Sequence, residues 1–205
     1  MKYPYHVWFI PDGNRTRAKQ HGCSELVGYN VWMKTGINLA RYVMHNTPIQ
    51  CITWRFMSTE NVVKRDENTI SNLLDIVVNV IDNYKKKKQE HSYNNWKYVN
   101  FAINYGWQDE ICRAVQQFAK SWKDLKTLDK AELCSYIEME QLPSLDLVIR
   151  TKWHYASRTS WFWSWSIWYA ELYFTDTFCP DFTIDEFIKI LERYDTIISY
   201  RNFGE

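Results

Sequence analysis

The sequence lacks an apolar run long enough to cross a membrane, and it has no excess of charge of one sign. A spanning helix needs about 20 consecutive apolar residues. The most aromatic stretch, "SWFWSWSIWYAELYF" at 160–174, is shorter and is interrupted by Glu171. The 25 Lys and Arg residues balance 24 Asp and Glu residues, for a net charge of +1. This balance argues against nucleic acid or an anionic membrane as a partner, so any affinity for phosphate has to come from a local cluster.

Three further signatures are missing. The five cysteines are widely scattered and form no C-x-x-C pair, which favours reduced thiols in a cytoplasmic protein over disulfides or zinc. Neither G-x-G-x-x-G nor G-x-x-x-x-G-K-[ST] occurs, so the dinucleotide and P-loop fingerprints are absent. No signal peptide is visible, because the first five residues lead directly into an apolar segment. We therefore expect a cytoplasmic location.

Aromatic residues, by contrast, are abundant. They make up 17% of the chain and include 11 tryptophans, four of them within 161–168. The hydrophobic share of 46% and the charged share of 24% are ordinary for a globular domain. A length of 205 residues fits one well-filled domain, and we expect a single domain over 1–205. The tryptophans indicate a large aromatic interior or an aromatic-lined cavity.

Short apolar runs alternate with segments of helical periodicity along the chain. We expect strands at 6–10, 49–56, 97–103, 145–150 and 171–174. We expect helices at 24–45, 66–84, 110–121, 129–139 and 183–194. This alternation predicts an α/β fold, with a mainly parallel central sheet flanked by helices. In such a sheet the site lies at the carboxyl ends of the strands, so we expect it in the polar turns at 12–17, 58–61, 104–108 and 150–160.

Six segments in these turns and strands resemble the motifs of one family. They are "HVWFIPDGN", "FMSTEN", "INYGWQDEI", "LDLVIRT", "WYAELYFTDTFCPDF" and "YRNFG". Together, and in this order, they resemble the motifs of the cis-prenyltransferases, the undecaprenyl diphosphate synthase superfamily, and they span almost the whole chain. The resemblance implies a homodimer whose substrates are prenyl diphosphates. Such an enzyme joins an allylic diphosphate to a homoallylic one with the help of Mg²⁺.

The resemblance also implies roles for individual residues. The metal site would consist of Asp12 and Glu171. The residues that act at the reacting centre would be Asp12, Asn14, Ser58 and Asn61. The diphosphates would be bound by Gly13, Asn14, Arg15, Arg17, Arg150, Arg158, Ser160 and Arg201, the last of these reaching the neighbouring subunit. The indoles expected to stabilise a carbocation are Trp8, Trp54, Trp161, Trp163, Trp165 and Trp168.

This chemistry is consistent with the residue types. Departure of diphosphate leaves negative charge on oxygen, which a metal ion and arginine donors stabilise. Mg²⁺ binds few protein carboxylates and relies on substrate phosphate oxygens. An indole face attracts a cation by up to about 2 kcal/mol when desolvated. The competing interpretation of each indole is simple core packing, and that of the lysines at 85–88 is a solvated helix end.

The chain departs from the family pattern where the allylic substrate would bind. Thr16 stands where the family has an arginine, and Arg17 stands at an aromatic position. Glu25 and Tyr29 replace an arginine and a histidine. The loop after Arg150 reads "KWHYA", about two residues longer than in the family. The histidine of that loop, His154, is a candidate base.

These departures favour a short-chain enzyme over a long-chain polymerase. The leading hypothesis is a Mg²⁺-dependent prenyltransferase that condenses C5 allylic and homoallylic diphosphates, including irregular head-to-middle coupling with cyclisation, as in the lavandulyl branch. The alternative is a terpene synthase of the same fold that ionises and cyclises geranyl or farnesyl diphosphate. A non-catalytic subunit is disfavoured because Asp12 and Glu171 are both present. The sequence leaves chain length, regiochemistry and stereochemistry open.

Overall fold

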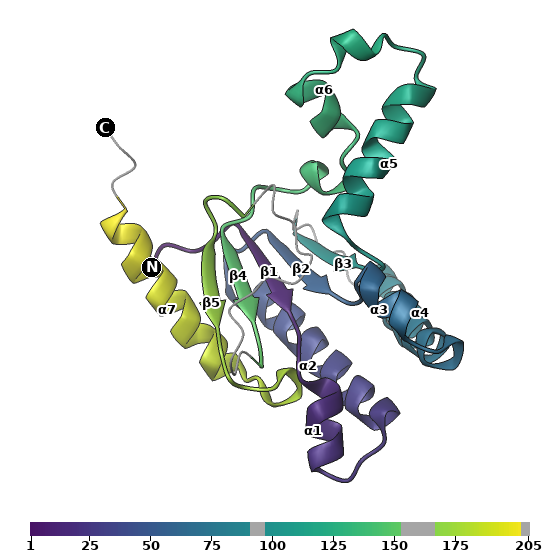
Figure 1. Cartoon of the computed structure of the whole chain (residues 1–205). Coiled ribbons are helices and arrows are strands. Elements are labelled where there is room, and N and C mark those ends of the chain that lie inside the picture. Colours follow the sequence, from purple (N-terminus) through teal and green to yellow (C-terminus); the bar gives the residue numbers. More distant parts are fainter. Residues whose placement is uncertain (91–96, 153–166, 202–205) are drawn as a thin grey trace.

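Five parallel strands form one sheet in the order β3-β2-β1-β4-β5 (Figure 1). The computed structural model describes residues 1–90, 97–152 and 167–201. The strands are β1 (His6–Ile10), β2 (Cys51–Arg55), β3 (Tyr98–Ala102), β4 (Leu147–Arg150) and β5 (Glu171–Phe174). Each lies within a segment that the sequence predicts as a strand, and the predicted parallel α/β fold is confirmed.

The central strand β1 is buried on both faces of the sheet. All five residues of "HVWFI" are buried, as expected for a strand in the middle of a parallel sheet. Since successive side chains point to opposite faces, Val7 and Phe9 join one apolar cluster while Trp8 and Ile10 join the other. The sheet therefore has two separate cores.

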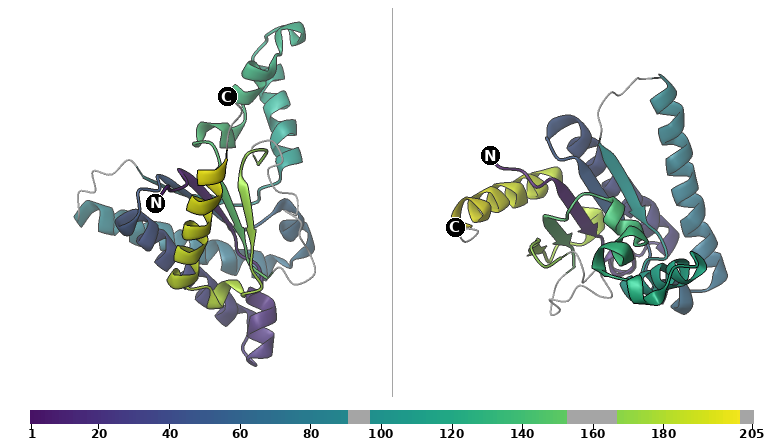
Figure 2. Two further views of the ribbon diagram at one scale, coloured as in Figure 1. Left: turned by 90° about the vertical axis from the view of Figure 1, so that its left-hand side faces the viewer. Right: turned by 90° about the horizontal axis from the view of Figure 1, so that it is seen from above.

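Three long helices pack on the face of the sheet that holds Val7 and Phe9. They are α2 (Glu25–Asn46), α4 (Glu67–Glu90) and α7 (Ile184–Tyr200) (Figures 1 and 2). Ser24 caps α2 by accepting a hydrogen bond from the amide of Val27, as its sequence position predicts. Thr183 caps α7 in the same way. No helix in the described part of the chain is long and apolar enough to span a membrane.

The opposite face is covered by the base of α5 (Trp107–Lys120) and by the segment that leads into β4. The far end of α5 and the short helix α6 (Lys130–Ser135) project from the body as an arm (Figure 1). The predicted helix at 129–139 is wrong in length. It breaks after α6 and resumes as the 3-10 helix η2 (Glu138–Gln141), because the Met139 amide donates to the Glu110 carboxylate at 3.0 Å instead of continuing α6.

Two short helices occupy segments that the sequence suggests are polar turns. They are α1 (Asn14–Gln20) and α3 (Thr59–Lys64), and each follows directly after a strand. One or two turns of helix are too short to show an apolar periodicity. Two 3-10 turns, η1 (Leu125–Thr127) and η3 (Cys179–Asp181), were not predicted for the same reason. The polar loops at the strand ends are thus partly helical.

A buried carboxylate ties α5 to the segment before β4, and it provides a test of the fold. Glu110 is 2% exposed and accepts hydrogen bonds from the Tyr105 hydroxyl at 2.7 Å and from the Met139 amide. Glu110→Ala leaves both donors buried without an acceptor. We expect it to lower the free energy of unfolding by about 2–4 kcal/mol in urea denaturation at neutral pH.

Glu110→Gln removes the titratable charge of this side chain but keeps an oxygen that can accept its hydrogen bonds. Burial raises the pKa of the Glu110 carboxyl above its ordinary value of 4.5, although the Tyr105 hydrogen bond opposes the shift. The wild-type free energy of unfolding, relative to that of Glu110→Gln, should therefore fall as the pH rises from 4.5 through the raised pKa. The exposed neighbour Glu138→Gln is the matched control. Wild type and Glu110→Gln with parallel pH curves would contradict this assignment.

Candidate active site at the ends of β1 and β4

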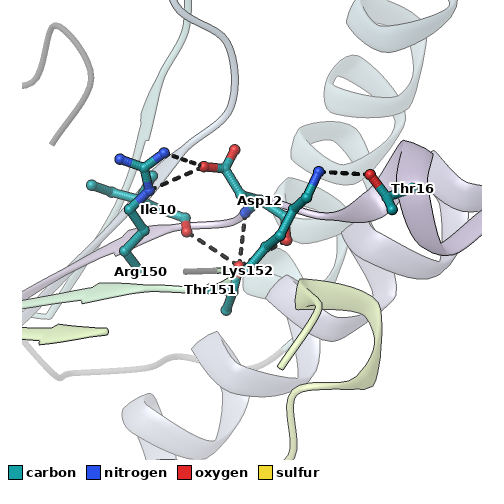
Figure 3. A network of polar contacts seen from close by, with 6 residues as sticks. All are labelled: Ile10, Asp12, Thr16, Arg150, Thr151 and Lys152. Atoms are coloured by element: carbon teal, nitrogen blue, oxygen red, sulfur yellow. Dashed lines mark hydrogen bonds and ion pairs between the residues drawn. The ribbon is translucent and has the colours of Figure 1, made fainter. Parts of the chain in front are cut away.

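Asp12 lies just beyond the carboxyl end of β1, and backbone contacts from two later segments fix its position (Figure 3). Its amide donates to the Thr151 hydroxyl at 2.7 Å, and that hydroxyl lies 2.9 Å from the Asp12 carbonyl oxygen. The amide of Cys179 donates to the same carbonyl at 2.9 Å. The carboxylate of Asp12 is thus held at the edge of the sheet where the strands end.

The next residue, Gly13, gives the chain its turn into α1. Its φ is +103°, a conformation that side chains with a Cβ rarely adopt. A Cβ at this position would lie 2.5 Å from Cδ1 of Phe178. Glycine is therefore required here for both backbone and packing reasons.

Arg150, the last residue of β4, forms an ion pair with the Asp12 carboxylate. The register pairs Ile10 with Arg150, so both strands leave the sheet at the same level. Nε and Nη2 of Arg150 donate to Oδ2 of Asp12 at 3.1 and 2.8 Å. Oδ1 accepts no hydrogen bond from the described residues, and Nη1 of Arg150 is buried without a partner among them. Each member of the pair therefore has one atom that the described residues leave without a hydrogen bond.

A hollow of about 990 Å³ opens above this ion pair. Five of its lining residues are basic and two are acidic; the basic ones are Arg15, Lys19, Arg65, Arg150 and Lys152. Asp12 and Glu25 are the acidic ones, and Glu25 is already paired with Arg15 at 2.9 Å. The hollow therefore has a local positive excess in a chain of almost neutral net charge. An excess of this sign suits a phosphate-bearing ligand.

Lys152 reaches into the hollow from an unusual backbone conformation. Its φ is +55°, which is strained for a residue with a Cβ. Its amide donates to the Thr177 carbonyl at 2.9 Å, and its ammonium donates to the Thr16 hydroxyl at 2.6 Å (Figure 3). A cation from the loop after β4 thus stands beside Thr16, the position where the family motif has an arginine.

A second, smaller cavity of about 70 Å³ lies beside the Asp12 loop. Its polar lining comes from Asp12, Asn14, Ser58, Asn61, Arg55 and Arg65. Its apolar lining includes Tyr29, Trp32, Phe56, Met57 and Leu73. Ser58 also caps α3, because its hydroxyl accepts from the Asn61 amide at 3.2 Å. The catalytic candidates thus face a cavity that is polar on one side and aromatic on the other.

Stacked aromatic rings fill the space beneath this cavity, between the sheet and α2. The rings of Phe9 and Trp54 stack in nearly parallel planes, with their centroids 4.7 Å apart. Trp32 lies 6.1 Å from Trp54 and 4.8 Å from Phe56, again between centroids. Gly36 on α2 leaves room for Trp54, since a Cβ there would lie 3.0 Å from the indole. Little space remains beneath the polar atoms.

The structure brings most of the predicted polar residues together. Gly13, Asn14, Arg15 and Arg150 line the larger hollow with Asp12, and Ser58 and Asn61 line the smaller cavity. Arg17 lies apart from both, because its Nε donates to Asp181 at 2.9 Å. Arg158, Ser160 and the candidate base His154 lie outside the described residues.

Glu171 and Asp12, the two predicted metal ligands, are not brought together within one chain. Glu171 begins β5 and pairs in register with Leu147, three residues before Arg150. At about 3.3 Å per residue, this places it roughly 10 Å back along the sheet. Its carboxylate pairs with Arg201 Nη2 at 2.7 Å. A metal site holding both carboxylates would need two copies of the chain.

The described tryptophans that the sequence analysis assigns to the substrate pocket do not line the cavity. Trp8 is fully buried in the core on the opposite face of the sheet, near Tyr105. Trp54 stacks behind the cavity without lining it, and Trp168 is 79% exposed. The remaining candidates, Trp161, Trp163 and Trp165, lie outside the described residues. In the described part of the chain, Trp32 is the indole that lines the cavity, and the sequence analysis did not nominate it.

The sequence analysis also missed four cations near Asp12: Lys19, Arg55, Arg65 and Lys152. The sequence does hint at a role for Arg55, because a charged residue there ends the otherwise apolar run "CITWRF". Arg65 and Lys152 lie outside the motifs on which the resemblance rests. Only the fold shows that they face the same space.

Lys152→Gly provides a test that separates stability from binding. Glycine adopts the positive φ without strain, so we expect the free energy of unfolding to rise by about 0.5–1 kcal/mol. Loss of the ammonium should weaken binding of inorganic diphosphate about tenfold, measured by calorimetry at fixed ionic strength.

Trp122→Gly is the matched control, because Trp122 also has a positive φ, of +60°, but is 96% exposed on the projecting arm. It should leave diphosphate affinity unchanged. Equal affinity in wild type and Lys152→Gly would remove Lys152 from the site.

Comparison with known proteins agrees with this arrangement. Residues 78–204 match the family described as "Putative undecaprenyl diphosphate synthase". The isoprenyl transferase of Aquifex aeolicus is 30% identical over 232 residues, which cover 100% of this chain and 97% of that protein. The isoprenyl transferase of Lactococcus lactis is also 30% identical, over 93% of this chain and 90% of its own length.

The fold agrees as well. The crystal structure of lavandulyl diphosphate synthase from Lavandula x intermedia, in complex with dimethylallyl diphosphate, matches with a TM-score of 0.85. The match covers 99% of both chains at 22% identity. With its six motifs in order, its parallel sheet and its cationic hollow at the strand ends, the chain belongs to the undecaprenyl diphosphate synthase family and is a prenyltransferase.

Proposed function

We propose that this prenyltransferase is a Mg²⁺-dependent short-chain enzyme, which condenses C5 allylic and homoallylic diphosphates. The observation that carries the proposal is the contrast between two adjoining spaces. The hollow above Asp12 is large and cationic, whereas the cavity beside it measures about 70 Å³ and is backed by stacked aromatic rings. The first suits diphosphate groups and the second limits the hydrocarbon.

The size of the smaller cavity supports a short substrate. Pockets that bind drug-sized ligands measure about 300–1,000 Å³, and this cavity, at about 70 Å³, is far smaller. A long polyprenyl chain would have to displace Trp32 and Trp54, which are buried and packed against Phe56 and Gly36. Interiors packed to this density resist such displacement.

The residues around Asp12 suit a magnesium ion that arrives with its substrate. No cluster of three or more His, Cys, Asp or Glu side chains is found among the described residues. Mg²⁺ does not require one, since it binds through one or two carboxylates and substrate phosphates. Oδ1 of Asp12 is left open by the Arg150 contact and faces the hollow's cationic lining. When bound, the ion would help to neutralise the charge of the leaving diphosphate.

The protein's own residues then have defined tasks. Arg150 orients Asp12 through Nε and Nη2, and it lines the hollow in which a phosphate group would sit. Ser58 and Asn61 line the cavity on the side of the Asp12 loop, where the reacting carbons would meet. Trp32 and Tyr29 exclude water and present ring faces to positive charge on carbon.

We also propose that the active form is a homodimer. Within one chain Glu171 and Arg201 pair with each other, on the side of the sheet away from Asp12. Both residues carry roles in the family motifs. A second copy of the chain that placed this pair beside Asp12 would complete the site.

Product analysis tests the proposed reaction. With dimethylallyl and isopentenyl diphosphates and Mg²⁺, we expect a C10 or C15 diphosphate, whose alcohol appears in gas chromatography only after phosphatase treatment. Recovery of only long products of the C50 type would contradict the short-chain assignment. Volatile products from geranyl or farnesyl diphosphate alone, without isopentenyl diphosphate, would instead favour the terpene synthase.

Alanine replacements test the two carboxylates. Asp12→Ala and Glu171→Ala should each lower turnover by about two to four powers of ten, because the charge of the transition state loses its partner. The affinity for substrate should change less, since the cations of the hollow remain. Near-normal turnover of Asp12→Ala in Mg²⁺ would contradict the metal assignment.

Mixing the two inactive variants tests the shared site. If Asp12 of one chain works with Glu171 of another, half of the randomly reassociated dimers hold one intact site of two, and about a quarter of wild-type activity returns. If both residues serve the same chain, mixing restores nothing. A mixture of Asp12→Ala with itself is the control.

A further inference from the structure

Arg55 is a buried cation without a hydrogen-bonding partner. It ends β2 in the middle of the sheet, next to β1, and is 9% exposed. Burial lowers the pKa of its guanidinium, whereas the carboxylate of Asp12 opposes this and the charge of Arg150 adds to it. Its guanidinium makes no hydrogen bond or ion pair with those residues whose side chains the structure describes. A guanidinium carries five N–H donors, so five donors lack a described acceptor.

Two carboxylates, Asp12 and Glu60, act on Arg55 electrostatically, and each is already paired with another cation. Arg55 lines the 70 Å³ cavity together with Arg65 and Asp12. The single carboxylate of Asp12 is already gripped by Arg150, through two hydrogen bonds to Oδ2. Nη1 of Arg150 is buried and also without a partner in the described chain. Arg55 thus has nearby carboxylates but no hydrogen-bonding partner among the described side chains, and Arg150 keeps one buried donor without an acceptor.

Such an arrangement is unfavourable for an empty protein and favourable for one that binds an anion. An uncompensated buried charge costs several kcal/mol in effective desolvation. Fixed donors that face a cavity, however, need no reorganisation when an anion enters. Stability alone therefore gives no reason for an arginine at this place in the strand.

We propose that Arg55 is a substrate-binding residue, which donates to a phosphate oxygen in the cavity beside the Asp12 loop. This inference rests on the proposed function for the identity of the ligand, a diphosphate ester. Arg55 approaches from β2 and Arg150 from β4, on either side of β1. Arg55 lines the smaller cavity, Arg150 lines the larger hollow, and Asp12 lines both. The anion would sit beside Asp12, where these two spaces adjoin.

Arg55→Met tests the proposal with inorganic diphosphate as the probe. Methionine fills a similar volume without the charge, so the unliganded variant should unfold at the same or a higher urea concentration than wild type. Its affinity for Mg²⁺-diphosphate, measured by calorimetry at fixed ionic strength, should fall about 10- to 100-fold. Arg41→Met, the same change at an exposed position of α2, is the matched control and should bind as wild type does.

Two outcomes would overturn the proposal. One is wild-type affinity for diphosphate in Arg55→Met. The other is a marked loss of stability with affinity retained by the folded fraction, which would make Arg55 a structural partner of Asp12. If Arg55→Met does not fold, Arg55→Lys decides, because lysine keeps the charge but loses the planar fork. A fall in affinity of about threefold or more supports the proposal, and unchanged affinity rejects it.

The experiment also separates this inference from the proposed function. Binding of inorganic diphosphate needs no prenyl substrate and no turnover. A wild-type protein that makes short prenyl diphosphates, together with an Arg55→Met variant of normal diphosphate affinity, rejects the role of Arg55 alone. Binding that depends on Arg55 in a protein that makes only long products upholds Arg55 and rejects the short-chain assignment.

Discussion

The parallel pairing of β1 with β4 is the constraint on which the site depends. It sets Ile10 opposite Arg150, so the residues that follow the two strands leave the sheet side by side. The Thr151 hydroxyl then ties the Asp12 backbone to the end of β4, and the Arg150 guanidinium ties the Asp12 side chain. A shift of one residue in this pairing would turn Arg150 to the other face of the sheet and separate both contacts.

The burial of β1 explains why this register is well defined. Its side chains enter two different apolar cores, with Phe9 on the α2 face and Trp8 on the α5 face. Fixing one residue in either core therefore fixes the strand along its length. The aromatic stack of Phe9 and Trp54 belongs to the same packing, since the two rings join β1 to β2 on the α2 face.

Buried charged side chains are ordinarily paired with an opposite charge, and the arginines of this site depart from that rule. Arg55 and Arg150 are both less than 10% exposed, yet only Arg150 makes an ion pair with Asp12, and Arg55 has no ion pair with a described side chain. A protein close to electrical neutrality has concentrated positive charge in one small volume. Burying like charges together is unfavourable without a counter-charge, so under the proposed function substrate binding and local stability would be coupled.

The sequence by itself determined the strands, the fold class and the family, because these depend on local patterns. An apolar run bounded by a polar turn is visible in "HVWFIPDGN", and the motif order places Asp12 and Arg150 at strand ends. The tertiary structure decided which side chains meet. The register moves Glu171 away from Asp12, strand alternation turns Trp8 to the far core, and Arg55, Arg65 and Lys152 converge from separate loops and strands. No local pattern encodes these relations, because each depends on how distant segments pack.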